Sequence, residues 1–130
     1  MISLVWWLRV VGVLFIVHFI AMVIARAPIR ALGPADALDR AKAGDPLAKF
    51  LVDSWVIFGL ENLAIGLVLL WCSGEGEYAR ALVWMVIAIE VLRGIVADVY
   101  MIVRTKKYAT SIVWIVIHSV VIVTGLIALH

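Results

Sequence analysis

The chain has 130 residues, of which 66% are apolar and 15% charged, and its formal net charge is +2. A soluble domain of this length cannot bury so many apolar side chains, so the composition predicts an integral membrane protein in contact with lipid. The charge does not indicate nucleic-acid binding, because the basic residues cluster at the ends of apolar segments. Cys72 is the only cysteine, which excludes an intrachain disulfide and a cysteine-based metal site.

Four apolar segments, at about residues 3–25, 50–71, 80–103 and 110–129, are each long enough to cross a bilayer as a helix. Short connections between consecutive helices make them antiparallel neighbours. The sequence therefore predicts an all-α membrane protein, a single domain over residues 1–130 with four transmembrane helices in an up-down bundle.

The first segment places His18 near the middle of the membrane, and Arg9 lies close enough to its end to reach the interface. The polar connector that follows, residues 26–49, contains a predicted short amphipathic helix at the level of the lipid headgroups. In that helix Asp36 and Arg40 are four residues apart and are predicted to pair, and Gly44 ends it. Asp45-Pro46 then has the pattern of an N-cap followed by proline at the first helical position.

The remaining segments carry ionisable and polar side chains that hydrocarbon disfavours. Glu61 and Asn62 lie at the centre of the second segment, Glu90 and Arg93 near the middle of the third, and His118 and Ser119 near the centre of the fourth. Glu90 and Arg93 are three residues apart and are predicted to pair on one helix face. Asp98 lies nearer the basic end of its segment, where headgroup water and Arg104 are its expected surroundings, so it is a secondary candidate.

The orientation follows from the distribution of lysine and arginine. Eight basic residues lie in the connectors 26–49 and 104–109, whereas the opposite side has only Arg80, with Arg9 at its edge. The positive-inside rule places these two connectors in the cytoplasm and both termini outside.

If the midpoints of the segments coincide, side chains from all four helices fall at one depth and should converge inside the bundle. This predicted polar layer contains His18, Glu61, Asn62, Glu90, Arg93 and His118, with Trp55, Asp98 and Ser119 as secondary members. One interpretation is a structural clamp that only holds the helices in register. Another is a proton-linked site in which two carboxylates share an arginine and a histidine relays the proton, as in a small transporter or a pocket for a lipophilic molecule.

Two further interpretations have less support from the residues. Histidine and glutamate are ligands for zinc or iron, but the spacings typical of metal helices are absent, so no metal or cofactor is predicted. Binding of haem through His18 and His118 stays open without further support. The last alternative is a membrane enzyme that acts on a lipid or quinone through a carboxylate and a histidine. The sequence contains no known catalytic motif, so an enzyme is the less favoured interpretation.

The segments WWLRVVGVLFIVHFI, ARAPIRALGP, AGDPLAKFLVDSWVIFGLENLAIGLVLL and RALVWMVIAIEVLRGIVADVYMI resemble the BphX-like family of small bacterial proteins, which is similar to the wider DoxX-like group. The resemblance implies a four-helix protein of the bacterial inner membrane without an established activity. Some relatives are encoded among genes for degrading aromatic compounds, which would suit a small hydrophobic ligand. The expected partners are therefore the bilayer, a hydrophobic small molecule and a second copy in a homodimer, or a larger complex in which the chain is an accessory subunit.

Overall fold

The computed structural model describes residues 3–74, 76–106 and 108–130, and the described part of the chain is helical without any strand. The all-α prediction is confirmed. The chain divides into two compact units. We call Gly12–Val68 the connector unit, and Met1–Val11 together with Leu69–His130 the hairpin unit.

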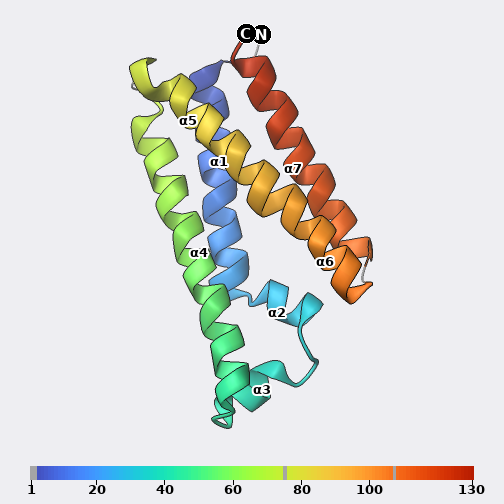
Figure 1. Ribbon diagram of the computed structural model, residues 1–130. Helices are drawn as coiled ribbons and strands as arrows, with labels where there is room; N and C mark the ends of the chain where they lie inside the picture. Colours follow the sequence, from blue (N-terminus) through green and yellow to red (C-terminus); the bar gives the residue numbers. More distant parts are fainter. Residues whose placement is uncertain (1–2, 75, 107) are drawn as a thin grey trace. The chain divides into compact units, whose positions relative to one another are not determined.

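The connector unit is built on two long helices that approach each other at glycines. The first helix, α1 (Leu4–Phe19), continues into a π-helical turn, η1 (Ile20–Ile24), and the second is α4 (Pro46–Cys72). They lie side by side in Figure 1. A Cβ atom on Gly66 would lie 2.7 Å from the carbonyl oxygen of Gly12, so this contact requires a residue without a side chain.

Two short helices, α2 (Ala27–Leu32) and α3 (Ala37–Lys42), form the polar connector between the long helices. The helix α3 ends just before Gly44, whose φ of 97° is in the left-handed region that glycine adopts without strain. The predicted end of the amphipathic helix is therefore confirmed.

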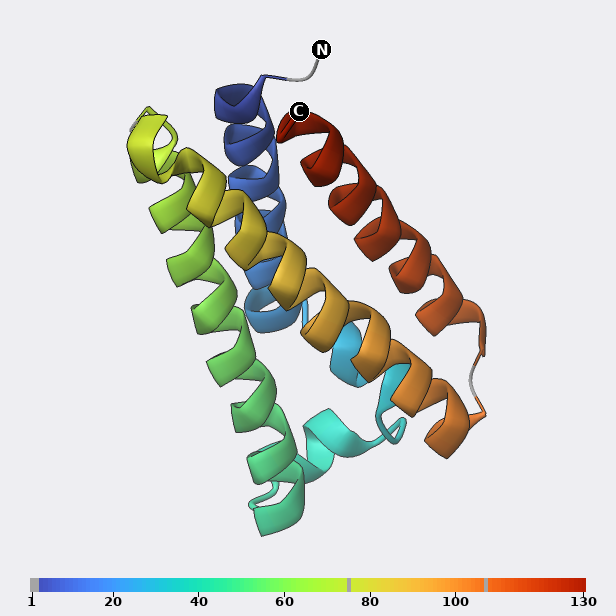
Figure 2. The same ribbon diagram turned by 45° about the horizontal axis from the view of Figure 1, so that its top comes forward.

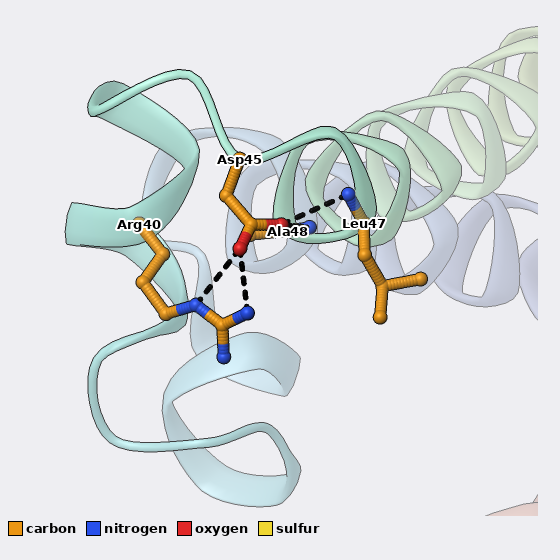
Figure 3. A network of polar contacts seen from close by, with 4 residues as sticks. All are labelled: Arg40, Asp45, Leu47 and Ala48. Atoms are coloured by element: carbon orange, nitrogen blue, oxygen red, sulfur yellow. Dashed lines mark hydrogen bonds and ion pairs between the residues drawn. The ribbon is translucent and has the colours of Figure 1, made fainter.

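Asp45 is the N-cap of α4, as the sequence pattern predicts (Figure 3). Its Oδ1 accepts hydrogen bonds of 2.9 Å from the backbone N–H groups of both Leu47 and Ala48, which satisfies two donors of the first turn. Its Oδ2 accepts bonds from Arg40 Nε and Nη2 at 3.1 and 2.6 Å. Arg40 makes its close ion pair with Asp45, which follows the turn at Gly44, and the predicted partner Asp36 acts on the guanidinium through its charge.

These contacts fix the charge of both groups, which lie outside the apolar spans. The hydrogen bond from the backbone N–H of Ala48, and then the bond from Arg40, hold the pKa of Asp45 below its ordinary value. The hydrogen bond to Asp45 likewise raises the pKa of Arg40.

The hairpin unit consists mainly of two long helical stretches. The first runs without interruption through α5 (Gly76–Ile89), a π-helical segment η2 (Glu90–Val96) and α6 (Ala97–Thr105). The second is α7 (Tyr108–Ala128), which packs along η2 and α6. In Figures 1 and 2, α6 and the first turns of α7, both coloured orange, lie next to each other.

Side-chain bonds at the other end of the hairpin unit tie its elements together. Trp7 Nε1 donates to Thr124 Oγ1 at 3.0 Å, and Arg9 Nε donates to Ser73 Oγ at 3.2 Å. Arg80 donates to the carbonyl oxygen of Leu129 at 2.8 Å, where the last carbonyls of a helix have no partner within the helix.

Three helices among the described residues are long and apolar enough to cross a membrane: Leu4–Ile24, Pro46–Cys72 and Tyr108–Ala128. They correspond to the predicted first, second and fourth segments. The second begins at Pro46 rather than near residue 50, because the Asp45 cap starts the helix earlier. The predicted third span, residues 80–103, lies within the stretch from Gly76 to Thr105, which contains Glu90, Arg93 and Asp98.

Candidate functional site

The polar side chains of the hairpin unit meet where η2 packs on α7. Glu90 is the first residue of η2, Asp98 follows in the first turn of α6, and His118 lies in the middle of α7. Helices with π geometry are rare and occur frequently at functional sites. The unusual segment of the backbone begins at Glu90 and ends two residues before Asp98.

His118 lies between the two carboxylates. Its Nδ1 contacts Glu90 Oε2, and its Nε2 lies 3.5 Å from Asp98 Oδ2. The side chains of His118, Glu90 and Asp98 are 14%, 10% and 19% exposed, respectively. We call these three residues the carboxylate–histidine cluster.

The close approach of the imidazole depends on Gly94, which lies between the two acidic residues on η2. A Cβ atom at this position would be 2.5 Å from His118 Cγ and 2.6 Å from its Nδ1. The ring therefore packs directly on the helix backbone. Trp114, one turn earlier on α7, lies beside the same ring with a centroid distance of 6.1 Å.

The cluster places one imidazole between two carboxylates. A neutral imidazole has one N–H donor and one acceptor nitrogen, whereas an imidazolium has two donors. The ring is not the only donor available to the cluster, because the carboxylate of Asp98 also accepts a hydrogen bond from the hydroxyl of Ser111.

Several predicted site residues lie in the connector unit and make other contacts. Asn62 is buried, and its Nδ2 donates to Met22 Sδ at 3.2 Å. Glu61 is exposed on α4, and His18 is half-buried on α1. Trp55 packs edge-on against Phe58 one turn later. Their predicted membership in a common polar layer stays a prediction.

Within the hairpin unit, the structure shows contacts of three predicted residues. Glu90 contacts His118, and its predicted pairing with Arg93, which is half-buried on η2, stays a prediction. Asp98 was expected beside Arg104 and is instead the second partner of the histidine. The hydroxyl of Ser119 donates to the Ile115 carbonyl of its own helix at 2.7 Å, so it does not join the cluster.

The contribution of Gly94 was missed at the sequence level. A signal was present, since Glu90, Gly94 and Asp98 are spaced by four residues each. Residues four apart lie near one another on a helix surface, so Gly94 is a neighbour of each acidic residue and marks a place where another side chain can approach. With α-helical winding, the two acidic residues themselves, eight apart, would lie about 80° from each other. No group of three His, Cys, Asp or Glu side chains arranged to hold a metal ion occurs among residues 3–74, 76–106 and 108–130.

Comparison with known families settles the relationship that the sequence indicated. The model of the BphX-like family matches residues 1–130. The chain belongs to the BphX-like family. The predicted resemblance is therefore confirmed for this family, and the wider likeness to DoxX-like proteins stays a prediction.

Relatives within the family carry no described activity in their names. An uncharacterized BphX-like protein of Burkholderia cepacia and another of Paraburkholderia xenovorans strain LB400 are each 38% identical to this chain over 84 residues. The aligned part covers 64% of this chain and 60% of the length of each relative. No solved structure matches the chain.

Proposed function

We propose that this BphX-like chain is a four-span protein of the bacterial inner membrane that exchanges a proton at the carboxylate–histidine cluster while it binds or passes a small lipophilic molecule. One observation carries the proposal: the two ring nitrogens of His118 face two different carboxylates within a largely apolar pair of helices. Ionisable groups at such positions are rare in membrane proteins and typically mark proton or substrate pathways.

The cluster also suits reversible exchange better than a fixed ion pair. A single carboxylate and an arginine would hold a permanent charge pair, because arginine does not release its proton in proteins. Histidine is the residue type that most often takes up and releases protons in proteins, so the proposed exchange is assigned to the ring of His118. A second carboxylate gives the proton two acceptors on opposite sides of one ring.

The proposal takes the stretch from Gly76 to Thr105, third in chain order, as an additional span beside the three long apolar helices, because it is longer than the roughly 20 residues that a crossing helix needs. Short connections on both of its sides favour an up-down arrangement. The eight basic residues of connectors 26–49 and 104–109 favour a cytoplasmic position for both, with the termini outside. Lys107, one of these eight, lies outside the described residues.

The ligand class rests on the membrane setting. A molecule that reaches a cluster within apolar helices through lipid must itself be lipophilic, and an aromatic compound or a quinone meets this condition. A homodimer would enlarge the room for such a molecule. An accessory subunit that uses the cluster only for assembly is the competing function.

Infrared difference spectroscopy between roughly pH 5 and 8, the range in which histidine titrates, tests the proton exchange in lipid nanodiscs. The expected spectrum contains linked carboxyl and imidazole bands, which disappear in Glu90→Gln and Asp98→Asn. Glu77→Gln is the matched control, because Glu77 is an exposed carboxylate on α5. If wild-type protein shows no carboxyl or imidazole change, or if the bands survive both cluster variants, the proposal is wrong and the assembly role gains.

A further inference from the structure

Glu90 and Asp98 contact the same imidazole although their spacing does not suit an α-helix. With 3.6 residues per turn, each residue advances by about 100°, so eight residues leave two side chains about 80° apart around the axis. Residues seven apart would lie within about 20° of each other. In an uninterrupted α-helix, the residue aligned with Glu90 would be Ala97 rather than Asp98.

The π-helical segment removes this mismatch. Its hydrogen bonds join residues five apart instead of four, so the backbone accommodates one additional residue over the same arc. Glu90–Val96 occupies nearly the whole interval between the two acidic residues. Eight residues here consequently cover the rotation that seven cover in an α-helix, and both carboxylates face α7.

Gly94 completes the arrangement at the midpoint of this face. A Cβ atom there would lie 2.5 to 2.8 Å from three ring atoms of His118, which leaves no room for alanine without a shift of the ring. An imidazole held away from the backbone at this point would lose its position between Glu90 and Asp98.

We infer that η2 and Gly94 act as positioning elements, which hold His118 as a bridge between two carboxylates that an α-helix would point in different directions. This inference rests on the proposed function for its biological meaning, because the bridge matters for activity only if the cluster exchanges protons. The bridge itself is a geometric feature and is measured separately.

Moving the second carboxylate by one residue tests the π register. The readout is the ring-nitrogen NMR signal of His118 in histidine-labelled protein in nanodiscs, with the Glu90→Gln variant used to assign the signal. Asp98→Ala should abolish the contribution of the second carboxylate to the Nε2 signal. The double variant Ala97→Asp/Asp98→Ala, which keeps the charge count, should resemble Asp98→Ala. Restoration of the wild-type signal by the double variant would show α-helical register and overturn the inference.

Gly94→Ala tests the close approach of the ring, and Gly74→Ala is its control, because a Cβ at Gly74 meets nothing within 4 Å. Gly94→Ala should change both ring-nitrogen signals of His118 while the signals of His18 and His130 stay in place. A purely structural role for Gly94 would lower thermal stability and leave the ring signals of the folded protein unchanged, which contradicts the inference. If Gly94→Ala does not fold, the comparison of Asp98→Ala with Ala97→Asp/Asp98→Ala tests the inference by itself.

The two proposals fail in different experiments. Bridged nitrogen signals without any infrared change between pH 5 and 8 would refute proton exchange and retain the positioning role. Infrared changes that persist while the charge-shifted double variant behaves like wild type would refute the positioning role and retain proton exchange.

Discussion

The hydrogen bond between Trp7 and Thr124 provides a quantitative test of the packing between α1 and α7. Trp7 is 5% exposed, and its indole N–H donates to the Thr124 hydroxyl at 3.0 Å. The same hydroxyl donates to the carbonyl oxygen of Val120 at 2.7 Å. Thr124 thus keeps a backbone partner when Trp7 is replaced, whereas the indole loses its acceptor when Thr124 is replaced.

The expected coupling follows from this asymmetry. Hydrogen bonds between membrane helices average about 0.6 kcal/mol and reach about 1.7 kcal/mol in double-mutant cycles. Trp7→Phe removes the bond and some buried ring area, while Thr124→Val removes the bond and leaves a buried donor. The cycle cancels the change in ring area and should give a coupling free energy of about 0.6 kcal/mol, within the upper value of about 1.7 kcal/mol.

The assay is reversible unfolding in mixed micelles, followed by circular dichroism for the wild type, the two single variants and the double variant. Trp6→Phe combined with Thr124→Val is the control, because Trp6 is 64% exposed and the two changes should be additive. A coupling energy indistinguishable from that control would refute the bond between α1 and α7.

Three further predictions concern the other contacts described above. Gly66→Ala should lower the free energy of unfolding by about 1–3 kcal/mol, measured by the same unfolding assay, because its Cβ would meet the Gly12 carbonyl. Asp45→Ala should expose the first turn of α4 to hydrogen exchange, and Asp45→Asn, which still caps, should do so less. Because the folded pKa of Asp45 is lowered, its stabilisation is present above its ordinary pKa of 3.8 and is lost as pH falls through the folded value. Exchange rates must be divided by the intrinsic, base-catalysed rate at each pH, and smaller protection factors at neutral than at acid pH would contradict this. Arg80→Gln should increase hydrogen exchange at the end of α7 by removing the charged donor to Leu129, and unchanged exchange there would contradict that role.

The helices were predictable because their signals are local. Long apolar runs, the Asp45-Pro46 cap and Gly44 each act within a few residues, and the structure confirms them. The partner of Arg40 was not predictable from helical spacing, because the chain leaves the helix at Gly44 and returns.

The cluster was predictable in composition but not in geometry. The sequence identified Glu90 and His118 as candidates from their depth in the segments, and it assigned Asp98 to headgroup water and Arg104 because this residue lies nearer the basic end of the third segment. With α-helical winding, Asp98 would also lie about 80° from Glu90 around the helix axis. A π-helical segment has no simple signature in one sequence, since the wider hydrogen-bond pattern is stabilised by what packs against it, here the imidazole of His118 over Gly94.

The π segment also has a consequence for insertions and deletions in the gene. A helix that already accommodates one surplus residue can lose a residue there and relax to ordinary winding, with both flanking portions keeping their orientation. Loss of exposed Val91 or Leu92 should therefore be tolerated far better than loss of a residue from α7, where every later side chain would rotate by about 100°. A deletion of one codon, which disrupts most long helices, is therefore expected to be tolerated within η2.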